Sequence, residues 1–308
     1  MHNSVMLPGL RFRRLATIVA TAMLSVAALL APAPRAHSQE VTPDLSSARR
    51  IVAISGDVTE IIYALGEEGR LVARDSTSLF PQAATALPDV GYMRALSPEG
   101  VLSVNPDAVL ASKSSGPPEA IDVLRKASVP FVFVPDGYDE AAIVAKVKVI
   151  GEALGVADKA AELSAKVEAD LADARARTAN IVERKRVLFI LSMQGGKVLA
   201  AGSSTAAAGV ISLAGAVNAV EGFTGYKPLT DEAIVSARPD VILMMDRTGN
   251  HAAGTADFAS HPALSQTPAI KTGAIVKMDG GYLLGFGPRT ADAVRDLARA
   301  FYGDAIVN

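Results

Sequence analysis

The stretches PEGVLSVNPDAVL (98–110) and DEAIVSARPDVIL (231–243) follow one pattern, and this pattern decides the predicted fold. Each stretch predicts a short helix, a Pro-Asp turn and a buried strand. The proline ends the helix because it cannot donate a backbone hydrogen bond and disfavours helical geometry in the preceding residue. Two copies at equivalent places predict two similar α/β lobes with mostly parallel sheets.

Apolar runs alternate with helical segments on both sides of the two copies. We expect strands at 51–54, 71–73, 108–110, 131–134 and 186–191, and helices at 58–65 and 205–213. Gly66 and Gly215 follow these helices and end them. The alternation indicates βαβ units in each half. Gly195-Gly196-Lys197 predicts a hairpin turn, because the earlier glycine of a phosphate-binding loop is missing.

A long amphipathic segment lies between the two halves. From Val156 to Ala174 apolar residues recur every three or four positions, which predicts one helix reaching about Ile181. We therefore divide the chain into an N-terminal lobe (39–155), a connecting backbone helix (156–184) and a C-terminal lobe (185–308). A helix between the lobes, in place of flexible strands, predicts a stiff molecule.

Residues 1–38 have the features of a secretory signal peptide. Arg11, Arg13 and Arg14 precede the apolar run 15–31, and small residues near Ser38 offer a cleavage site. The chain contains no cysteine, which excludes lipid attachment at a cysteine, disulfides and thiolate metal sites. We expect a free periplasmic protein. An uncleaved N-terminal anchor is the weaker alternative.

The composition of the remaining chain excludes several classes of protein. Removing residues 1–38 takes away four basic and no acidic residues, leaving 26 basic against 32 acidic residues and a formal charge of −6. This charge does not fit nucleic-acid binding. A chain of about 270 residues is longer than a single hydrophobic core usually supports, which predicts two lobes. No nucleophile elbow, Walker A loop or HExxH helix is present, so we do not expect an enzyme.

The loop LPDVGYMRALS (87–97) immediately precedes the first copy of the pattern. In open α/β sheets, ligands bind on loops beyond the carboxyl ends of the strands. Tyr92 and Arg94, two residues apart in an extended segment, are expected to project from the same side. A guanidinium beside a phenol stabilises the phenolate, which suits ferric iron, and tyrosinate is an axial ligand in some haem proteins. The residues alone leave open that Tyr92 only packs or hydrogen-bonds.

From Arg50 to Ala305 the chain resembles the periplasmic haem-binding proteins of Gram-negative haem ABC importers, in the helical-backbone class of substrate-binding proteins. The matching stretches are VGYMRALS (90–97), NPD (105–107), VLAAG (198–202) and LGFGPRT (284–290). The resemblance implies that Tyr92 is the axial ligand of a transported ferric haem b and Arg94 its hydrogen-bonding partner. No histidine lies between His37 and His251, so we expect one haem with five-coordinate iron.

The same resemblance implies the partners of a monomeric carrier. Glu99 and Glu232 hold equivalent positions in the two copies, and each would dock on arginines of one subunit of an inner-membrane permease dimer, which works with its ATPase. A structural explanation also exists, because acidic residues suit the first turn of a helix.

Haem further requires apolar walls and cations for its propionates. Arg247, after the strand 241–245, and Lys113, after the strand 108–111, are the candidate cations, with Arg74 as a third. Arg289 caps or supports the pocket in our interpretation. Candidate apolar contacts are Met93, Met193, Met245 and Phe286, whereas we assign Met244 to the core.

Two histidines remain after the predicted signal peptide, His251 and His261, which are too few for a multi-imidazole zinc or manganese site. We expect His261 to cap or pack, and we keep His251 as a remote ligand candidate.

Three alternatives remain. The nearest is a ferric-siderophore or corrinoid binding protein of the same fold, which the absence of tryptophan disfavours. A periplasmic enzyme would need a nucleophile, base or metal cluster that the motifs do not supply. An adaptor or chaperone-like protein does not fit the paired Pro-Asp units.

Overall fold

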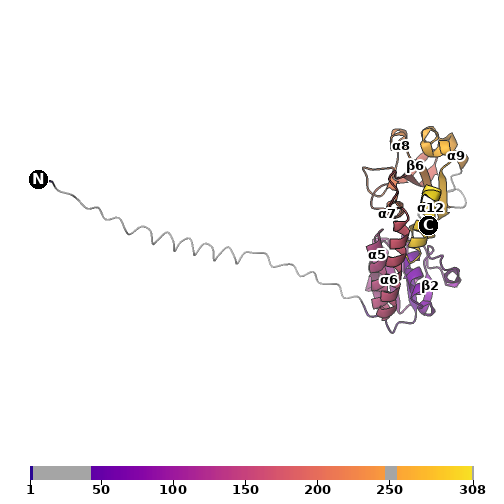
Figure 1. The fold of residues 1–308 in the computed structure, drawn as a ribbon. Helices are drawn as coiled ribbons and strands as arrows, with labels where there is room; N and C mark the ends of the chain where they lie inside the picture. The colour runs from indigo at the N-terminus through magenta and orange to yellow at the C-terminus, as the bar shows by residue number, and fades with distance from the viewer. Residues whose placement is uncertain (3–42, 247–254, 307–308) are drawn as a thin grey trace. The chain divides into compact units, whose positions relative to one another are not determined.

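The computed structural model describes residues 1–2, 43–246 and 255–306, drawn in Figure 1. Residues 42–308 form one compact unit, which is described here by itself. Apart from its first two residues, the predicted signal peptide lies outside the described residues. Among the residues that are described, no helix is long and apolar enough to cross a membrane.

Ten strands of the described residues form the two sheets. Their bounds are β1 (Ile51–Ile54), β2 (Leu71–Arg74), β3 (Ala108–Ser112), β4 (Phe131–Val134), β5 (Arg186–Gln194), β6 (Lys197–Ala201), β7 (Val217–Asn218), β8 (Tyr226–Pro228), β9 (Val241–Asp246) and β10 (Ile275–Asp279).

The helices of the described residues connect these strands and cover their faces. Their bounds are α2 (Gly56–Ala64), α3 (Pro98–Leu102), α4 (Pro118–Lys126), α5 (Glu140–Leu154), α6 (Ala157–Ala176), α7 (Ala206–Leu213), α8 (Asp231–Ala237), α9 (Thr255–Ser260), α10 (Pro268–Thr272), α11 (Gly280–Leu284) and α12 (Thr290–Tyr302).

The first lobe contains a parallel sheet with the strand order β2-β1-β3-β4. Its central strand β1 is buried on both sides: Ile51 and Ala53 join a core with α2 and α5, whereas Val52 and Ile54 join a core with α3 and α4. Strands covered on both faces explain the unbroken apolar runs in this half of the sequence.

The second lobe contains a mixed sheet with the order β10-β9-β5-β6-β8, and β7 pairs with β5. β10, β9, β5 and β7 are parallel, whereas β6 runs antiparallel to β5 and to β8. Gly195 (φ 55°) and Gly196 (φ 76°) form the predicted hairpin turn, a backbone geometry that favours glycine. The predicted fold class, two α/β lobes with mostly parallel strands, is confirmed, and the second lobe adds an antiparallel edge.

The two copies of the sequence pattern have the same local structure. Ser97 Oγ accepts from Gly100 N at the start of α3, and Thr230 Oγ1 accepts from Ala233 N at the start of α8, both at 3.2 Å. Before each Pro-Asp turn one residue adopts a left-handed conformation, Asn105 (φ 48°) in the first copy and Arg238 (φ 42°) in the second.

Each Pro-Asp turn is also fastened to the first strand of its own lobe. The Asp107 carboxylate accepts hydrogen bonds from the backbone N–H groups of Arg49 and Arg50 at 2.8 and 2.9 Å. The Asp240 carboxylate accepts one from Arg186 N at 2.8 Å. The aspartate of the pattern therefore sets the register between neighbouring strands in both lobes.

The connecting helix α6 ends at Ala176, so the prediction that it reaches Ile181 is wrong. Turns replace the helix from Arg177 onward, and the buried Thr178 side chain lies so close to Gly215 that a Cβ at that glycine would collide with it. This tertiary contact fixes the point at which the helix ends.

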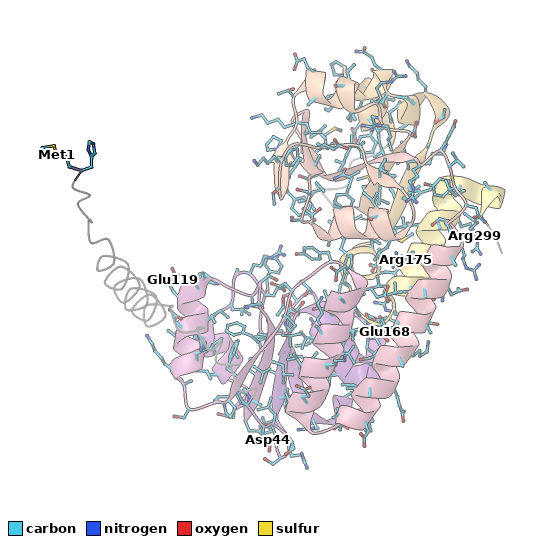
Figure 2. All side chains as sticks on the ribbon, turned by 60° about the vertical axis from the view of Figure 1, so that its left-hand side comes forward. Met1, Asp44, Glu119, Glu168, Arg175 and Arg299 are labelled. Atoms are coloured by element: carbon cyan, nitrogen blue, oxygen red, sulfur yellow. The ribbon has the colours of Figure 1, made fainter. Side chains whose placement is uncertain are left out.

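α6 belongs to the cores of both lobes. Ala160, near its start, packs in the first-lobe core with α5, whereas Leu171 and Ala174 pack in the second-lobe core with α12. Arg295 of α12 pairs with Asp173 of α6 at 3.2 Å. Figure 2 shows α12, labelled at Arg299, beside the part of α6 that carries Arg175.

Candidate ligand-binding site

The loop that carries Tyr92 is fastened to the end of β2. Arg74 N donates to Pro88 O, Val90 N to Arg74 O and Ser76 N to Gly91 O, each at 2.9 Å. These bonds continue the β2 backbone into the loop. The loop is therefore held in place on the first lobe by its own backbone bonds.

Asp89 closes the base of this loop. Its carboxylate accepts from Gly91 N and Ser76 Oγ at 2.9 Å and pairs with Arg74 at 3.0 Å. Partial burial raises the pKa of Asp89, but the hydrogen bonds from Gly91 and Ser76 and the charge of Arg74 outweigh it and hold that pKa below the usual value. Arg74 is buried and engaged here, so its candidacy as a propionate cation is wrong.

Tyr92 to Ala95 form a turn, not the predicted extended segment, because Ala95 N donates to Tyr92 O at 2.8 Å. Met93 is 7% exposed and packs with Leu96 in the first-lobe core, so it is not an available ligand contact as predicted. Tyr92 is 45% exposed and Arg94 is also exposed. Burial of Met93 between them leaves both side chains on the outside of the lobe.

Arg94 lies within electrostatic reach of two further tyrosines. Tyr138 lies between β4 and α5, and Tyr226 lies on β8 of the second lobe. Burial raises the pKa of both phenols, the neighbouring charge of Asp136 adds to this at Tyr138, and Arg94 acts to lower both pKa values. The loop of the first lobe and an edge strand of the second lobe thus approach the same region.

Aromatic contacts hold both tyrosines. The Tyr138 ring meets the Phe286 ring edge-on at 5.5 Å, and the Tyr226 ring meets the Phe189 ring at 6.4 Å between centroids. Phe286 is only 2% exposed, so it supports the site from beneath Tyr138, whereas we predicted that it would line the ligand directly.

Tyr138 and Tyr226 are not among the residues predicted from the sequence. A signal for Tyr226 was present, because Gly225-Tyr226 precedes the second copy of the pattern as Gly91-Tyr92 precedes the first. Both glycines have positive φ, 101° at Gly91 and 80° at Gly225. No comparable motif marks Tyr138, which reaches the region through the path of the chain between β4 and α5.

The other residues predicted to contact the ligand differ in their exposure. Lys113 is exposed directly after β3, at the mouth of the first lobe, and Met193 is half-buried near the end of β5. Met244 lies in the core as predicted, and Met245 is half-buried against the second-lobe core. Arg247 and His251 lie outside the described residues.

His261 is 6% exposed and structural, in agreement with its predicted capping role. Its Nδ1 accepts from the backbone N–H groups of Ala263 and Leu264 at 3.2 and 3.3 Å, so Nε2 carries the proton and donates to Gly196 O at 2.9 Å. Within the part of the chain that the structure describes, no group of three or more histidine, aspartate or glutamate side chains is arranged to hold a metal ion.

Comparison with known proteins decides the family. The family model described as "Periplasmic binding protein" matches residues 51–282. The chain belongs to the periplasmic binding protein family. Its membership agrees with the expected solute-binding role and with the prediction that the protein is not an enzyme.

Three relatives of this periplasmic binding protein cover most of its length. The structure titled "Periplasmic heme-binding protein BhuT in complex with two hemes" is 41% identical, with a TM-score of 0.78, and covers 83% of this chain and 98% of its own. "Periplasmic heme-binding protein RhuT from Roseiflexus sp. RS-1 in apo form" is 38% identical, with a TM-score of 0.80, and covers 84% and 99%. The "Uncharacterized ABC transporter substrate-binding lipoprotein YvrC" of Bacillus subtilis (strain 168) is 30% identical over 273 residues, 87% of this chain and 84% of its own.

The two glutamates predicted to dock on a permease are both exposed in this periplasmic binding protein. A hydrogen bond from Ser97 Oγ at 2.8 Å, followed by the Glu99 backbone N–H, lowers the pKa of Glu99. The backbone N–H of Glu232, followed by the Thr230 hydroxyl, lowers the pKa of Glu232. Both side chains are therefore ionised at neutral pH.

A groove of about 400 Å³ adjoins Glu232. Asp231 and Glu232 supply its carboxylates, and Val235, Pro262 and Gln266 line the rest. Its largely apolar walls beside two acidic groups fit a long cationic side chain, whose methylene groups would cover the walls.

Proposed function

We propose that this protein captures ferric haem in the periplasm and delivers it to an ABC permease. The observation that carries the proposal is the exposed pair Tyr92 and Arg94 on a preformed turn, with Tyr138 and Tyr226 within electrostatic reach of Arg94. The likeness to two solved haem-binding proteins over nearly their whole length supports it.

In this proposal the Tyr92 oxygen is the axial ligand of the iron of haem b, and Arg94 stabilises its anionic form. A phenolate is a hard ligand that favours ferric over ferrous iron. Lys113 and Arg247 would meet the propionates, and Met193 would supply an apolar contact. With no histidine between His37 and His251, we expect one haem with five-coordinate iron.

The proposed partners follow from the two docking glutamates. Glu99 and Glu232 each lie in the first turn of an equivalent helix on its own lobe, and a permease built from two like subunits offers two like sites. We propose that the protein docks as a monomer on an inner-membrane permease dimer served by its ATPase. A periplasmic location follows from this role.

A haemin titration followed by visible absorption tests the proposed ligand. The wild type is expected to give a ferric tyrosinate spectrum, and Tyr92→Phe is expected to lose it. Tyr92→Ala is expected to weaken binding by at least about 100-fold, the upper end of what loss of a second-shell partner costs. Tyr63→Phe, on α2, is the matched control and should behave as wild type.

An unchanged spectrum and affinity in Tyr92→Ala would refute the assignment of the iron ligand. A parallel titration with cyanocobalamin and a ferric hydroxamate siderophore separates the alternative function. Tight binding of either compound without haemin binding would replace the haem proposal with a corrinoid or siderophore carrier.

A further inference from the structure

The two carboxylates of α2 are buried although neither belongs to the proposed site. Asp57 and Glu60 lie one helical turn apart and are 7% and 8% exposed. Burying a carboxylate is costly unless a cation and further hydrogen bonds compensate it. Glu60 contacts the segment 286–289 directly, and Asp57 is connected to it through Lys146. This segment leads into α12, which belongs to the second lobe.

Glu60 binds this segment through Arg289. Its Oε1 accepts from Arg289 N at 3.0 Å, and its Oε2 accepts from Nε and Nη2 of the same residue at 3.0 and 2.9 Å. The Arg289 guanidinium also lies 3.4 Å above the centre of the Phe80 ring, in the first lobe. A planar, forked cation is required for this combination, since an ammonium group cannot bind bidentately and stack.

Asp57 binds the same segment through Lys146. Lys146 is 3% exposed, its Nζ lies 2.5 Å from Asp57 Oδ2, and it also donates to Phe286 O at 3.3 Å. Phe286 holds a left-handed backbone (φ 49°), which costs energy for a residue with a side chain and persists only where neighbours enforce it. Its carbonyl bond to Lys146 is one such contact.

The segment also touches the proposed site. The Phe286 ring supports Tyr138, and Tyr138 lies within electrostatic reach of Arg94. Contacts between α2 and the segment 286–289 are therefore continuous with contacts that place an aromatic side chain in the site.

We propose that Asp57, Glu60, Lys146 and Arg289 form an inter-lobe lock, a second rigid connection beside α6, and that they are positioning residues for ligand binding. The lock sets the spacing between the Tyr92 turn on the first lobe and Tyr226 on the second. The ligand then binds without a large closure of the lobes. The lock itself stands on contacts within the protein, and only its effect on haem affinity rests on the proposed function.

Distance measurements between the lobes test the lock without any ligand. The chain has no cysteine, so the exposed positions Glu119→Cys on α4 and Val235→Cys on α8 can carry two nitroxide labels without background. Double electron–electron resonance is expected to give one narrow distance distribution in the otherwise unchanged protein. Glu60→Gln and Arg289→Ala are expected to broaden it.

Conservative variants guard against simple misfolding. Arg289→Lys keeps the charge but not the fork and should broaden the distribution less than Arg289→Ala, with native circular dichroism. Glu140→Gln removes the exposed pair with Arg175 (3.3 Å) and should leave the distribution narrow. Narrow distributions in both Glu60→Gln and Arg289→Lys would overturn the lock.

Haemin titration of the same variants tests the positioning role. Glu60→Gln and Arg289→Lys are expected to weaken binding by about tenfold, the scale of a lost supporting contact, while keeping the spectrum given by Tyr92. Tyr92→Phe should show the reverse: a lost spectrum with a narrow distance distribution. Broadened distances with unchanged haemin affinity would overturn the positioning role and leave the haem proposal intact.

Discussion

At the scale of single residues, Tyr92 is exposed because its neighbours in the loop are buried. Met93 and Leu96 pack into the first-lobe core, and Asp89 ties Gly91 to Arg74 below the turn. The phenol is thus presented by a scaffold of ordinary packing and one ionised carboxylate. A phenol on such a support loses little conformational freedom when it binds a partner, which favours affinity.

Asp89→Asn is expected to loosen this support and to lower the free energy of unfolding by less than about 1 kcal/mol, since the side chain is 41% exposed. The pKa of Asp89 is lowered in the folded protein, so its contribution is complete above the unfolded value near 3.8 and is lost as the pH falls through the folded pKa. Urea unfolding should show a constant difference from wild type between about pH 5 and 7 that shrinks below about pH 4. Asp122→Asn, on the exposed face of α4, is the control, and a difference independent of pH would contradict the argument.

At the scale of elements, the helix–Pro-Asp–strand unit was predictable because its determinants are local. Caps, proline and the apolar strand all lie within one short stretch, and the structure repeats them in α3–β3 and α8–β9. The end of α6 was not predictable, because it depends on Thr178 meeting Gly215 from another part of the chain. The same holds for the site: Tyr92 and Arg94 lie together in the loop 87–97 and could be named from it, although that loop is a turn and not extended, whereas Tyr138 becomes relevant only through folding.

The two copies of the repeated unit carry different residues at the left-handed position, Asn105 and Arg238, so exchanging the residue types tests how the left-handed backbone affects stability. A left-handed backbone costs most side chains about 1–2 kcal/mol, and asparagine tolerates it better. Arg238→Asn is therefore expected to raise the free energy of unfolding by about 0.5–1 kcal/mol, and Asn105→Arg to lower it by a similar amount. Thermal or urea denaturation measures both, and shifts of the same sign would show that φ at these positions is not the deciding factor.

At the scale of the whole molecule, the two lobes, each with a core on both faces of its sheet, are joined by α6 and by the proposed inter-lobe lock. Each lobe also carries one ionised glutamate at the start of an equivalent helix. If the proposed lock fixes the lobes, it also fixes the separation of the two glutamates. A carrier of this kind would meet its transporter as one rigid body, and the docking surfaces would not depend on the ligand.

The double variant Glu99→Lys with Glu232→Lys reverses both charges and is expected to leave haemin affinity unchanged. Uptake is measured in proteoliposomes that hold the cognate permease and its ATPase. It is expected to fall at least about tenfold, because a lysine would face the arginines of the permease at both contacts. Glu232→Lys alone should cost more than Glu99→Lys alone. Asp231 and the apolar groove accompany Glu232, whereas Pro98 stands at the position equivalent to Asp231. Glu119→Lys controls for net charge, and uptake equal to wild type in the double variant would remove both glutamates from the docking surface.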